Sequence, residues 1–315
     1  MFKALVIGCG NIGAMYDFDT DRVLTHAKAY HLHPGFSFDV FDIDAVQAHR
    51  VSERYGCIER NSINESILSE YDCISICSPT STHYEILSLA FQCGVNAIIC
   101  EKPVSSDLKE IEKLRNQYSL SGSKVLVNYF RRFQPCYIEL KETIKGLLQK
   151  EEITNINIRY QRGFMNNCSH AFDIIEFLIG KPLILSNITL FHSKNDHFKD
   201  DPTISFGAEW NNSQIAVIGL SDVNFSHFEI DIYFKFYKIK ISEAGNRIDI
   251  MEAEKGERFL RPLNVVDRLT RENCLTDYMI PVTDRLYQLI TRKSEEDNFN
   301  CSLDLNERLL TYINQ

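Results

Sequence analysis

The stretch "VIGCGNIG" places Gly8, Gly10 and Gly13 in a GxGxxG pattern directly after a compact apolar run, "KALVIG". The first glycine of such a pattern permits a tight turn, the second lets backbone approach a pyrophosphate, and the third lets a helix pack closely. The alternative is a chance glycine-rich turn, which the position directly after a first strand disfavours. The stretch therefore predicts a dinucleotide site that also includes Asn11 and Ile12.

Strand-like and helix-like segments alternate over residues 1–127. The strands are "KALVIG", "FSFDVFD", "CISICS", "AIICE" and "KVLVNYF", and the helices between them are "THAKAYHLH", "DAVQAHRVSERYG", "HYEILSLAFQCG" and "SDLKEIEKLRNQYSLSG". Apolar strands that alternate with helices of this length predict an α/β fold, a doubly wound parallel sheet of the Rossmann type with helices on both faces.

The remaining residues, 128–315, follow a different pattern. Since 315 residues are more than one hydrophobic core usually supports, we expect a second domain here. Several strand-like runs with few helices between them predict an α+β domain with a mostly antiparallel sheet, followed by helices around "TDRLYQLI" and "LDLNERLLTYI". The alternation in "HFEIDIYFKFYKIKI" changes phase near Tyr237, which predicts a bulge or a tight turn.

The acidic residue expected at the ribose of a dinucleotide lies in "FDVFDID". Asp42 is our first choice and Asp44 the second. Asp42 follows Gly8 by 34 positions, where about 20 is usual, and the excess predicts that residues 16–24 are an insertion overhanging the cofactor or the substrate. Because a carboxylate accepts hydrogen bonds from a ribose diol and repels a 2′-phosphate, NAD is favoured over NADP.

Composition excludes several classes of partner. With 34 basic and 43 acidic residues the formal net charge is −9, which argues against nucleic acid. No apolar run approaches the length that crosses a membrane. The ten cysteines form no CxxC pair, so we expect neither a zinc ribbon nor a disulfide framework, but buried, reduced thiols of a cytoplasmic protein.

Four further motifs narrow the class. These are "SPTSTHYEI", "EKP" at residues 101–103, "NYFRRFQP" and "SHAFDIIEFLIGKP". Together with the glycine pattern, their order and spacing resemble the glucose–fructose oxidoreductase/inositol dehydrogenase (Gfo/Idh/MocA) family over essentially the whole chain. The resemblance implies a Rossmann domain followed by an open-faced sheet domain. It also implies a nicotinamide-dependent reaction at a carbinol carbon, usually of a sugar or cyclitol.

The resemblance also implies residue roles on the cofactor side, for Ser78, Pro79, His83, Glu101 and Lys102. Lys102 would stand beside the nicotinamide and hydrogen-bond the reacting oxygen. Its sequence position supports this role independently, because a lysine at the carboxyl end of a parallel strand points into the ligand crevice of such folds. There an ammonium can stabilise a developing alkoxide. The alternative is a solvated lysine in a turn.

The stretch "RGFMNNCSHAFDIIEFLIGKP" contains His170, which matches the acid–base histidine of the family. Helical spacing predicts a helix that starts near residues 167–169 and stops at Gly180, so His170 lies in the first turn. A helix N-terminus disfavours imidazolium and keeps a histidine able to accept a proton. Asp173, one turn further on the same face, could orient the ring.

At Asn166 many members of the family carry an aspartate, and an amide can hold a hydroxyl but cannot accept its proton. Competing interpretations of His170 are a structural histidine and a metal ligand. The metal interpretation is disfavoured because only Cys168 lies nearby in the sequence. Arg131, Tyr160 and Arg162 are further predicted to face the substrate.

The leading prediction is an NAD-dependent oxidoreductase of a sugar, cyclitol or nucleotide sugar, with Lys102 and His170 as the proton-handling pair. One alternative is a glycosidase that uses bound NAD to oxidise the sugar transiently, and another is a dinucleotide-binding protein with little catalysis. The "FEIDIYF" alternation leaves one sheet face to be covered. The resemblance implies that a second subunit covers it, in a homodimer or homotetramer.

Overall fold

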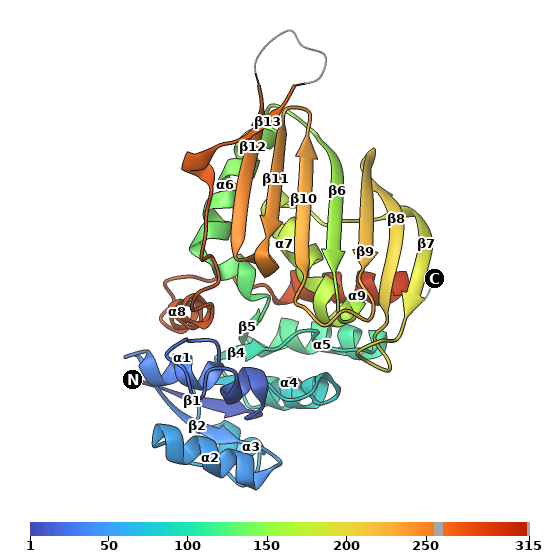
Figure 1. Ribbon diagram of the computed structural model, residues 1–315. Helices are drawn as coiled ribbons and strands as arrows, with labels where there is room; N and C mark the ends of the chain where they lie inside the picture. Colours follow the sequence, from blue (N-terminus) through green and yellow to red (C-terminus); the bar gives the residue numbers. More distant parts are fainter. Residues whose placement is uncertain (255–260, 314–315) are drawn as a thin grey trace. The chain divides into compact units, whose positions relative to one another are not determined.

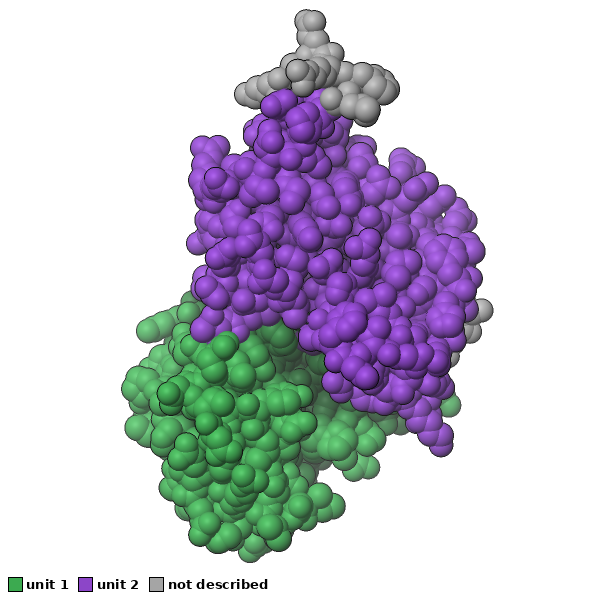
Figure 2. Space-filling model, viewed as in Figure 1, with its two compact units in different colours: residues 1–133, 277–315 green, residues 134–276 purple. Residues whose placement is uncertain are grey.

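The computed structural model describes residues 1–254 and 261–313. The chain forms two compact units, each described below by itself. Unit 1 comprises residues 1–133 and 277–315, and unit 2 comprises residues 134–276 (Figure 2). The predicted division ran instead at residue 127, with the whole remainder in the second domain.

Unit 1 is built on a five-stranded parallel sheet of order β2-β1-β3-β4-β5. Its strands are β1 (Phe2–Ile7), β2 (Phe36–Phe41), β3 (Cys73–Ile76), β4 (Ala97–Cys100) and β5 (Lys124–Val127). An isolated parallel bridge between Val40 and Glu59 places the segment around Glu59 next to β2, where a sixth strand would lie. The resulting order corresponds to the 3-2-1-4-5-6 arrangement of dinucleotide-binding sheets, as the sequence predicts.

The helices of unit 1 include α5 (Leu108–Ser121), whose two ends lie at residues that local chemistry favours. They are α1 (His26–Leu32), α2 (Ala45–Tyr55), α3 (Glu65–Leu68), α4 (His83–Gln92), α5 (Leu108–Ser121), α8 (Met279–Ile290) and α9 (Phe299–Ile313). Asp107 accepts a hydrogen bond from the Lys109 N–H at the start of α5, and Gly122 ends that helix with φ +71°. Both are ordinary cap residues for these positions.

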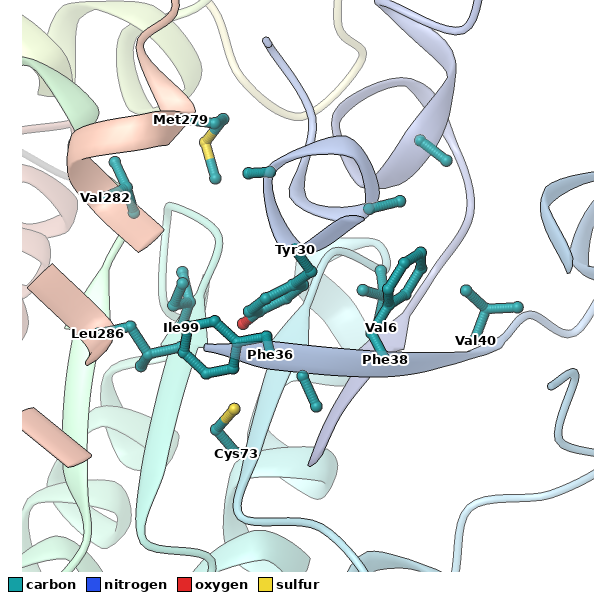
Figure 3. Packing of buried hydrophobic residues seen from close by; sticks show 14 of the residues in the cluster. Val6, Tyr30, Phe36, Phe38, Val40, Cys73, Ile99, Met279, Val282 and Leu286 are labelled. Carbon is teal, nitrogen blue, oxygen red and sulfur yellow. The ribbon is translucent and has the colours of Figure 1, made fainter. Parts of the chain in front are cut away.

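Helix α8 packs into the core of unit 1 although it follows unit 2 in the sequence. Figure 3 shows Met279, Val282 and Leu286 in one cluster with Tyr30 and Ile99, and all five side chains are buried. The predicted division missed this because an amphipathic helix shows which of its faces is apolar but not which core that face joins.

Unit 2 is built on an eight-stranded sheet of order β13-β12-β11-β10-β6-β9-β8-β7, with helices α6 (Pro135–Leu148) and α7 (Ser169–Ile179) on one side (Figure 1). Its strands are β6 (Ile153–Tyr160), β7 (Ser186–Lys194), β8 (Thr203–Trp210), β9 (Ser213–Gly219), β10 (Phe228–Phe234), β11 (Tyr237–Ser242), β12 (Arg247–Ala253) and β13 (Leu263–Val265). Only the β6–β9 pair is parallel among the pairings between these described strands. The predicted mostly antiparallel sheet is confirmed.

The phase change predicted near Tyr237 is a tight turn. β10 ends at Phe234 and β11 begins at Tyr237, so two residues connect the antiparallel strands. Along β10, Ile230 and Ile232 are fully buried and alternate with partly exposed polar residues. The sheet therefore has one apolar and one polar face, as alternation with a period of two requires.

The cysteines were predicted to be buried, reduced thiols, and the structure departs from this in their exposure. All ten thiols are free, but Cys301 is exposed and four others are only partly buried. None of the helices in the described ranges is long and apolar enough to cross a bilayer.

Candidate active site

The glycine turn after β1 has the geometry that its sequence pattern predicts. Gly8 has φ +99°, and a Cβ there would lie 2.7 Å from both the Cys77 carbonyl carbon and the Ser78 nitrogen. A Cβ on Gly13 would lie 2.0 Å from the Gly8 carbonyl oxygen. A Cβ on Gly10 would meet no described atom within 4 Å. The first and third glycines thus permit close packing, while the second leaves the backbone open to a ligand.

A short π-helical turn, η1 (Asn11–Met15), follows the glycines. The Ala14 and Met15 N–H groups both donate to the Gly10 carbonyl, at 2.9 and 3.1 Å. The N–H groups of Asn11 and Ile12 precede these bonds, which is the part of a helical turn that binds anions. The predicted contributions of both residues to a pyrophosphate site fit this geometry.

Asp42 lies against the glycine turn. Its Oδ2 accepts a hydrogen bond from the Cys9 N–H at 2.6 Å, and its Oδ1 accepts one from the Asp44 N–H at 2.9 Å. Asp44, the second choice, instead caps α2 by accepting from the Val46 and Gln47 N–H groups. The structure therefore favours Asp42 over Asp44 as the residue that would hold a ribose.

The insertion at residues 16–24 is tied to unit 1 at both ends. The buried Asp17 carboxylate accepts hydrogen bonds from the Leu24 N–H at 2.5 Å and from the Thr25 N–H at 2.8 Å. The Asp277 carboxylate accepts from the Val23 N–H at 2.9 Å, and the Val23 side chain is buried in the core. The insertion is thus an anchored part of unit 1.

His83 holds two loops of unit 1 together. Its Nε2 lies 2.9 Å from the Ser78 carbonyl oxygen and its Nδ1 lies 3.0 Å from the Pro103 carbonyl oxygen. These two contacts raise the pKa of His83, but burial has the larger effect and lowers the pKa overall. The ring is only 1% exposed. His83 was predicted to line the cofactor, but its ring supports the backbone at Ser78 and Pro103. Of the other two residues predicted on the cofactor side, Ser78 is partly exposed and Pro79 is exposed.

Glu101, at the carboxyl end of β4, belongs to a buried polar cluster. Its Oε1 accepts a hydrogen bond from Asn128 Nδ2 at 2.6 Å and lies 3.1 Å from His26 Nε2. Burial raises the pKa of Glu101, but the contacts with His26 and Asn128 and the charge of Lys102 outweigh burial and lower it overall. An ionised carboxylate thus directly precedes Lys102 in the chain.

In unit 2 the α-helix that carries His170, α7, begins at Ser169, within the predicted range. A π-helical turn, η4 (Phe164–Cys168), leads directly into α7, and Cys168 at the junction has helical φ and ψ of −65° and −29°. The Met165 and Asn166 N–H groups near the start of this π-helical turn donate to the Asp201 carboxylate at 2.7 and 2.8 Å. His170 therefore does not lie at an open helix N-terminus, which corrects the predicted reason for a neutral ring.

His170 and Asp173 are both buried in α7, at 7% and 2% exposure. Asn166 lies one turn before His170 and is partly exposed. Its Nδ2 donates to the Arg162 carbonyl oxygen at 3.4 Å. Lys102 belongs to unit 1 and these three residues belong to unit 2, so their joint action remains a prediction.

Tyr160 and Arg131 were predicted to face the substrate, but both side chains are buried. Tyr160 is fully buried, and its hydroxyl donates to the Ile204 carbonyl at 3.0 Å and accepts from the Ile204 N–H at 2.8 Å. Burial raises the pKa of Tyr160 far above its usual value. Tyr160 is therefore structural, which corrects the prediction. Arg131 is buried in unit 1, over the Phe130 ring, while Arg162 is exposed with φ +64°.

Residues 2–129 match the model of an oxidoreductase family with an NAD-binding Rossmann fold, GFO_IDH_MocA. This segment is therefore similar to the Gfo/Idh/MocA oxidoreductases. The glycine turn, Asp42 and Lys102 all lie within this Gfo/Idh/MocA segment. The family predicted from the motifs is confirmed.

Two curated relatives align with parts of the chain. Inositol 2-dehydrogenase from Rhizobium meliloti is 26% identical over 155 residues, which are 45% of this chain and 47% of that protein. UDP-N-acetylglucosamine 3-dehydrogenase from Acidithiobacillus ferrooxidans is 29% identical over 137 residues, 44% and 40% of the two chains. The chain thus spans about half the length of these relatives or less in the alignments.

The fold of the whole chain is similar to that of a solved dehydrogenase. The crystal structure of the A. ferrooxidans UDP-N-acetylglucosamine 3-dehydrogenase superimposes with a TM-score of 0.74, covering 99% of this chain and 95% of that one, at 19% identity. At this identity the likeness shows the fold, including the sheet of unit 2 that lies outside the matched family segment.

Three residues of these surroundings were missed from the sequence, namely His26, Asn128 and Asp201. His26 directly follows the insertion in "LTHAKAY", and Asn128 directly follows β5. The position of Asn128 at the carboxyl end of a parallel strand was a usable signal. Asp201 lies 35 positions from the N–H group that it caps, and no local pattern marks it. Among residues 1–254 and 261–313, no three His, Cys, Asp or Glu side chains are grouped to hold a metal ion.

Proposed function

We propose that the protein is a nicotinamide-dependent oxidoreductase that transfers a hydride between NAD and a carbinol or keto carbon of a sugar, cyclitol or nucleotide sugar. The observation that carries this proposal is the pairing of an open glycine turn with Lys102 at the carboxyl end of β4. Both features lie at the sheet edge where such folds bind ligands. The names of the two relatives, an inositol and a nucleotide-sugar dehydrogenase, support the substrate class.

Different residues of unit 1 would contact different parts of the cofactor and the substrate. The turn that contains Gly10 would receive the pyrophosphate, and Asp42 would accept hydrogen bonds from the ribose hydroxyls. Bound NAD would supply the hydride acceptor. Lys102 would donate a hydrogen bond to the reacting oxygen and stabilise negative charge that develops there.

In unit 2, His170 would accept the proton from the substrate hydroxyl, and Asp173 would orient its ring. Asn166 would hold a neighbouring hydroxyl without transferring a proton. This assignment rests on the match to the family motif and on the shared location of His170 and Asp173 in α7. We further propose that Asp42 selects NAD over NADP, because its carboxylate would repel a 2′-phosphate.

The test is an assay of net NADH formation with NAD and a panel of myo-inositol, scyllo-inositol, UDP-N-acetylglucosamine and free hexoses. NADH formation that depends on Lys102 supports the proposal. Cleavage of a glycoside panel without net NADH would identify the glycosidase alternative. Tight NAD binding with neither reaction would identify a binding protein.

We also propose a homo-oligomer that uses the open face of the unit 2 sheet. This face carries charge pairs: Lys238 Nζ lies 3.0 Å from Asp231 Oδ1, and Arg159 lies 3.9 Å from Glu229. Charge pairs would make such an interface salt-sensitive. Light scattering at low and high salt measures the oligomeric state.

The ten free cysteines support a cytoplasmic location, which fractionation of the source cells would test.

A further inference from the structure

At the carboxyl ends of β4 and β5, unit 1 encloses three polar side chains from separate segments of the chain. His26 begins α1, Glu101 follows β4 and Asn128 follows β5. Their exposed fractions are 0%, 9% and 1%. His26 Nε2 and Asn128 Nδ2 both address one carboxylate oxygen, Glu101 Oε1, at 3.1 and 2.6 Å. The cluster thus presents two donors to a single buried acceptor.

Stability alone does not account for this cluster. Because Glu101 accepts at Oε1, the His26 ring must donate through Nε2, which leaves Nδ1 facing the interior. Neither His26 Nδ1 nor Asn128 Oδ1 has a hydrogen-bond partner among the described residues. Buried polar atoms without partners carry a desolvation cost that apolar side chains of similar shape avoid. A role beyond packing is therefore indicated.

The charge of Glu101 extends to its neighbours in unit 1. The charge of Lys102 is among the influences that lower the pKa of Glu101, and charge–charge coupling of this kind is reciprocal. Burial raises the pKa of Tyr278, and the negative charge of Glu101 raises it further. A carboxylate that favours ammonium and disfavours phenolate therefore directly precedes Lys102 in the chain.

We propose that His26 and Asn128 are positioning residues that hold Glu101 as a carboxylate next to Lys102, so that the Lys102 ammonium keeps its place and its charge. The catalytic meaning of this cluster rests on the proposed function, in which Lys102 stabilises a developing alkoxide. The positioning itself is a property of unit 1 and can be measured without a substrate.

The first experiment measures how fast Lys102 reacts with trinitrobenzenesulfonate in the full-length protein at neutral pH, by mass spectrometry of the peptide that contains it. Only the free amine reacts. Glu101→Gln keeps the shape and an acceptor but removes the charge, so we expect Lys102 to react about three- to tenfold faster, since one pKa unit is tenfold in free amine. Glu70→Gln, a matched change in an ion pair elsewhere in unit 1, should leave the rate unchanged. Equal rates in Glu101→Gln and the wild type would overturn the proposal.

The second experiment separates a donor at His26 from simple space filling. His26→Leu removes the donor, whereas His26→Gln keeps an amide N–H able to reach Glu101. We expect faster Lys102 labelling in His26→Leu and a near-wild-type rate in His26→Gln. If both variants label alike, His26 is a packing residue and the proposal fails. Should His26→Leu not fold, Glu101→Gln still decides the question.

With a substrate in hand, His26→Leu and Asn128→Leu should lower kcat by about tenfold or more while the affinity for NAD stays within about twofold, and His26→Gln should recover most of kcat. Loss of NAD affinity in proportion to kcat would contradict positioning of Lys102. If the wild type oxidises nothing in the panel, the proposed function fails, whereas the labelling results still decide whether the cluster sets the state of Lys102.

Discussion

The segments that follow β1 and β6 have the same local design in the two units. Each strand leads to a glycine with positive φ, Gly8 at +99° and Gly163 at +82°. Each glycine precedes a five-residue π-helical turn, η1 in unit 1 and η4 in unit 2. In both, backbone N–H groups are presented at the start of a helical turn, where an anion is favoured.

The two turns differ in what occupies that position. In unit 1, the space beside Gly10 is open to 4 Å among the described atoms. In unit 2, the Asp201 carboxylate accepts from the Met165 and Asn166 N–H groups, and a Cβ on Gly163 would lie 2.1 Å from its Oδ2. One turn is thus available to an external phosphate, and the chain's own carboxylate closes the other. Local backbone geometry creates the anion site, and the tertiary structure determines whether a ligand or a carboxylate of the chain itself occupies it.

The largest effect should distinguish the chemical contributions of the two units. Lys102→Ala and His170→Ala should each lower the rate of hydride transfer by about 10²–10⁴-fold, with Lys102 the larger because it also stabilises charge. Asn166→Ala should mainly raise KM, and Asp173→Asn should cost less than His170→Ala. Single-turnover NADH absorbance is the measurement, with NAD binding as the control. Near-wild-type turnover in His170→Ala would make it a packing residue.

The second effect tests the packing of the open turn. Gly13→Ala places a Cβ against the Gly8 carbonyl, so we expect a loss of about 3 kcal/mol or more in the free energy of unfolding of unit 1. Gly10→Ala is the matched control and should change stability by less than about 0.5 kcal/mol while weakening NAD binding. Urea denaturation without NAD gives both values. Equal stability of the two variants would show that the close approach at Gly13 is not needed.

The third effect concerns the closed turn. Asp201→Ala removes the acceptor of two N–H groups, and it should reduce the free energy of unfolding by about 1–2 kcal/mol. NAD affinity should not change, because Asp201 belongs to unit 2. Calorimetry and NAD titration of the same samples test this pair of outcomes. Weaker NAD binding in this variant would contradict the separation of the two turns.

A further prediction compares the two carboxylates beside the open turn. The wild type should bind NAD at least tenfold more tightly than NADP, about 1.4 kcal/mol, and Asp42→Asn should reduce that preference. Asp44→Ala, which removes the side-chain cap of α2, should lower stability but keep the preference. Titration of both cofactors decides it. Equal affinities in the wild type would remove Asp42 from this role, and Arg22 in the insertion at residues 16–24 would become the next residue to test.

The smallest effect tests the corrected role of Tyr160. Tyr160→Phe removes both hydrogen bonds to Ile204, so stability should fall by about 1 kcal/mol. Catalytic rate should be unchanged once temperature is chosen to keep the variant folded. Thermal unfolding and turnover are measured together. A loss of rate without a loss of stability would support the original prediction that Tyr160 faces the substrate.

The parts of the protein that the sequence determines by itself are those with a local physical signal. The strands of unit 1 were predicted because they are short apolar runs, and α7 was predicted to end at Gly180, which has φ +73°. The role of Gly13 also follows from backbone sterics within a few residues, because its Cβ would meet the Gly8 carbonyl, whereas the close approach at Gly8 is to Cys77 and Ser78, far along the chain. The turn between β10 and β11 was predicted because a hairpin reverses the phase of alternation.

What only the tertiary structure decided involves pairs of residues far apart in the chain. Glu101 meets His26 across 75 positions, and Asp201 meets Asn166 across 35. Hydrogen bonds of this kind leave no period in the sequence, since each partner needs only to be polar and to arrive at the same place. The same reason hid the packing of α8 into unit 1, because an apolar helix face identifies no particular partner. Whether a backbone N–H group faces a ligand or the chain's own carboxylate is likewise set by folding.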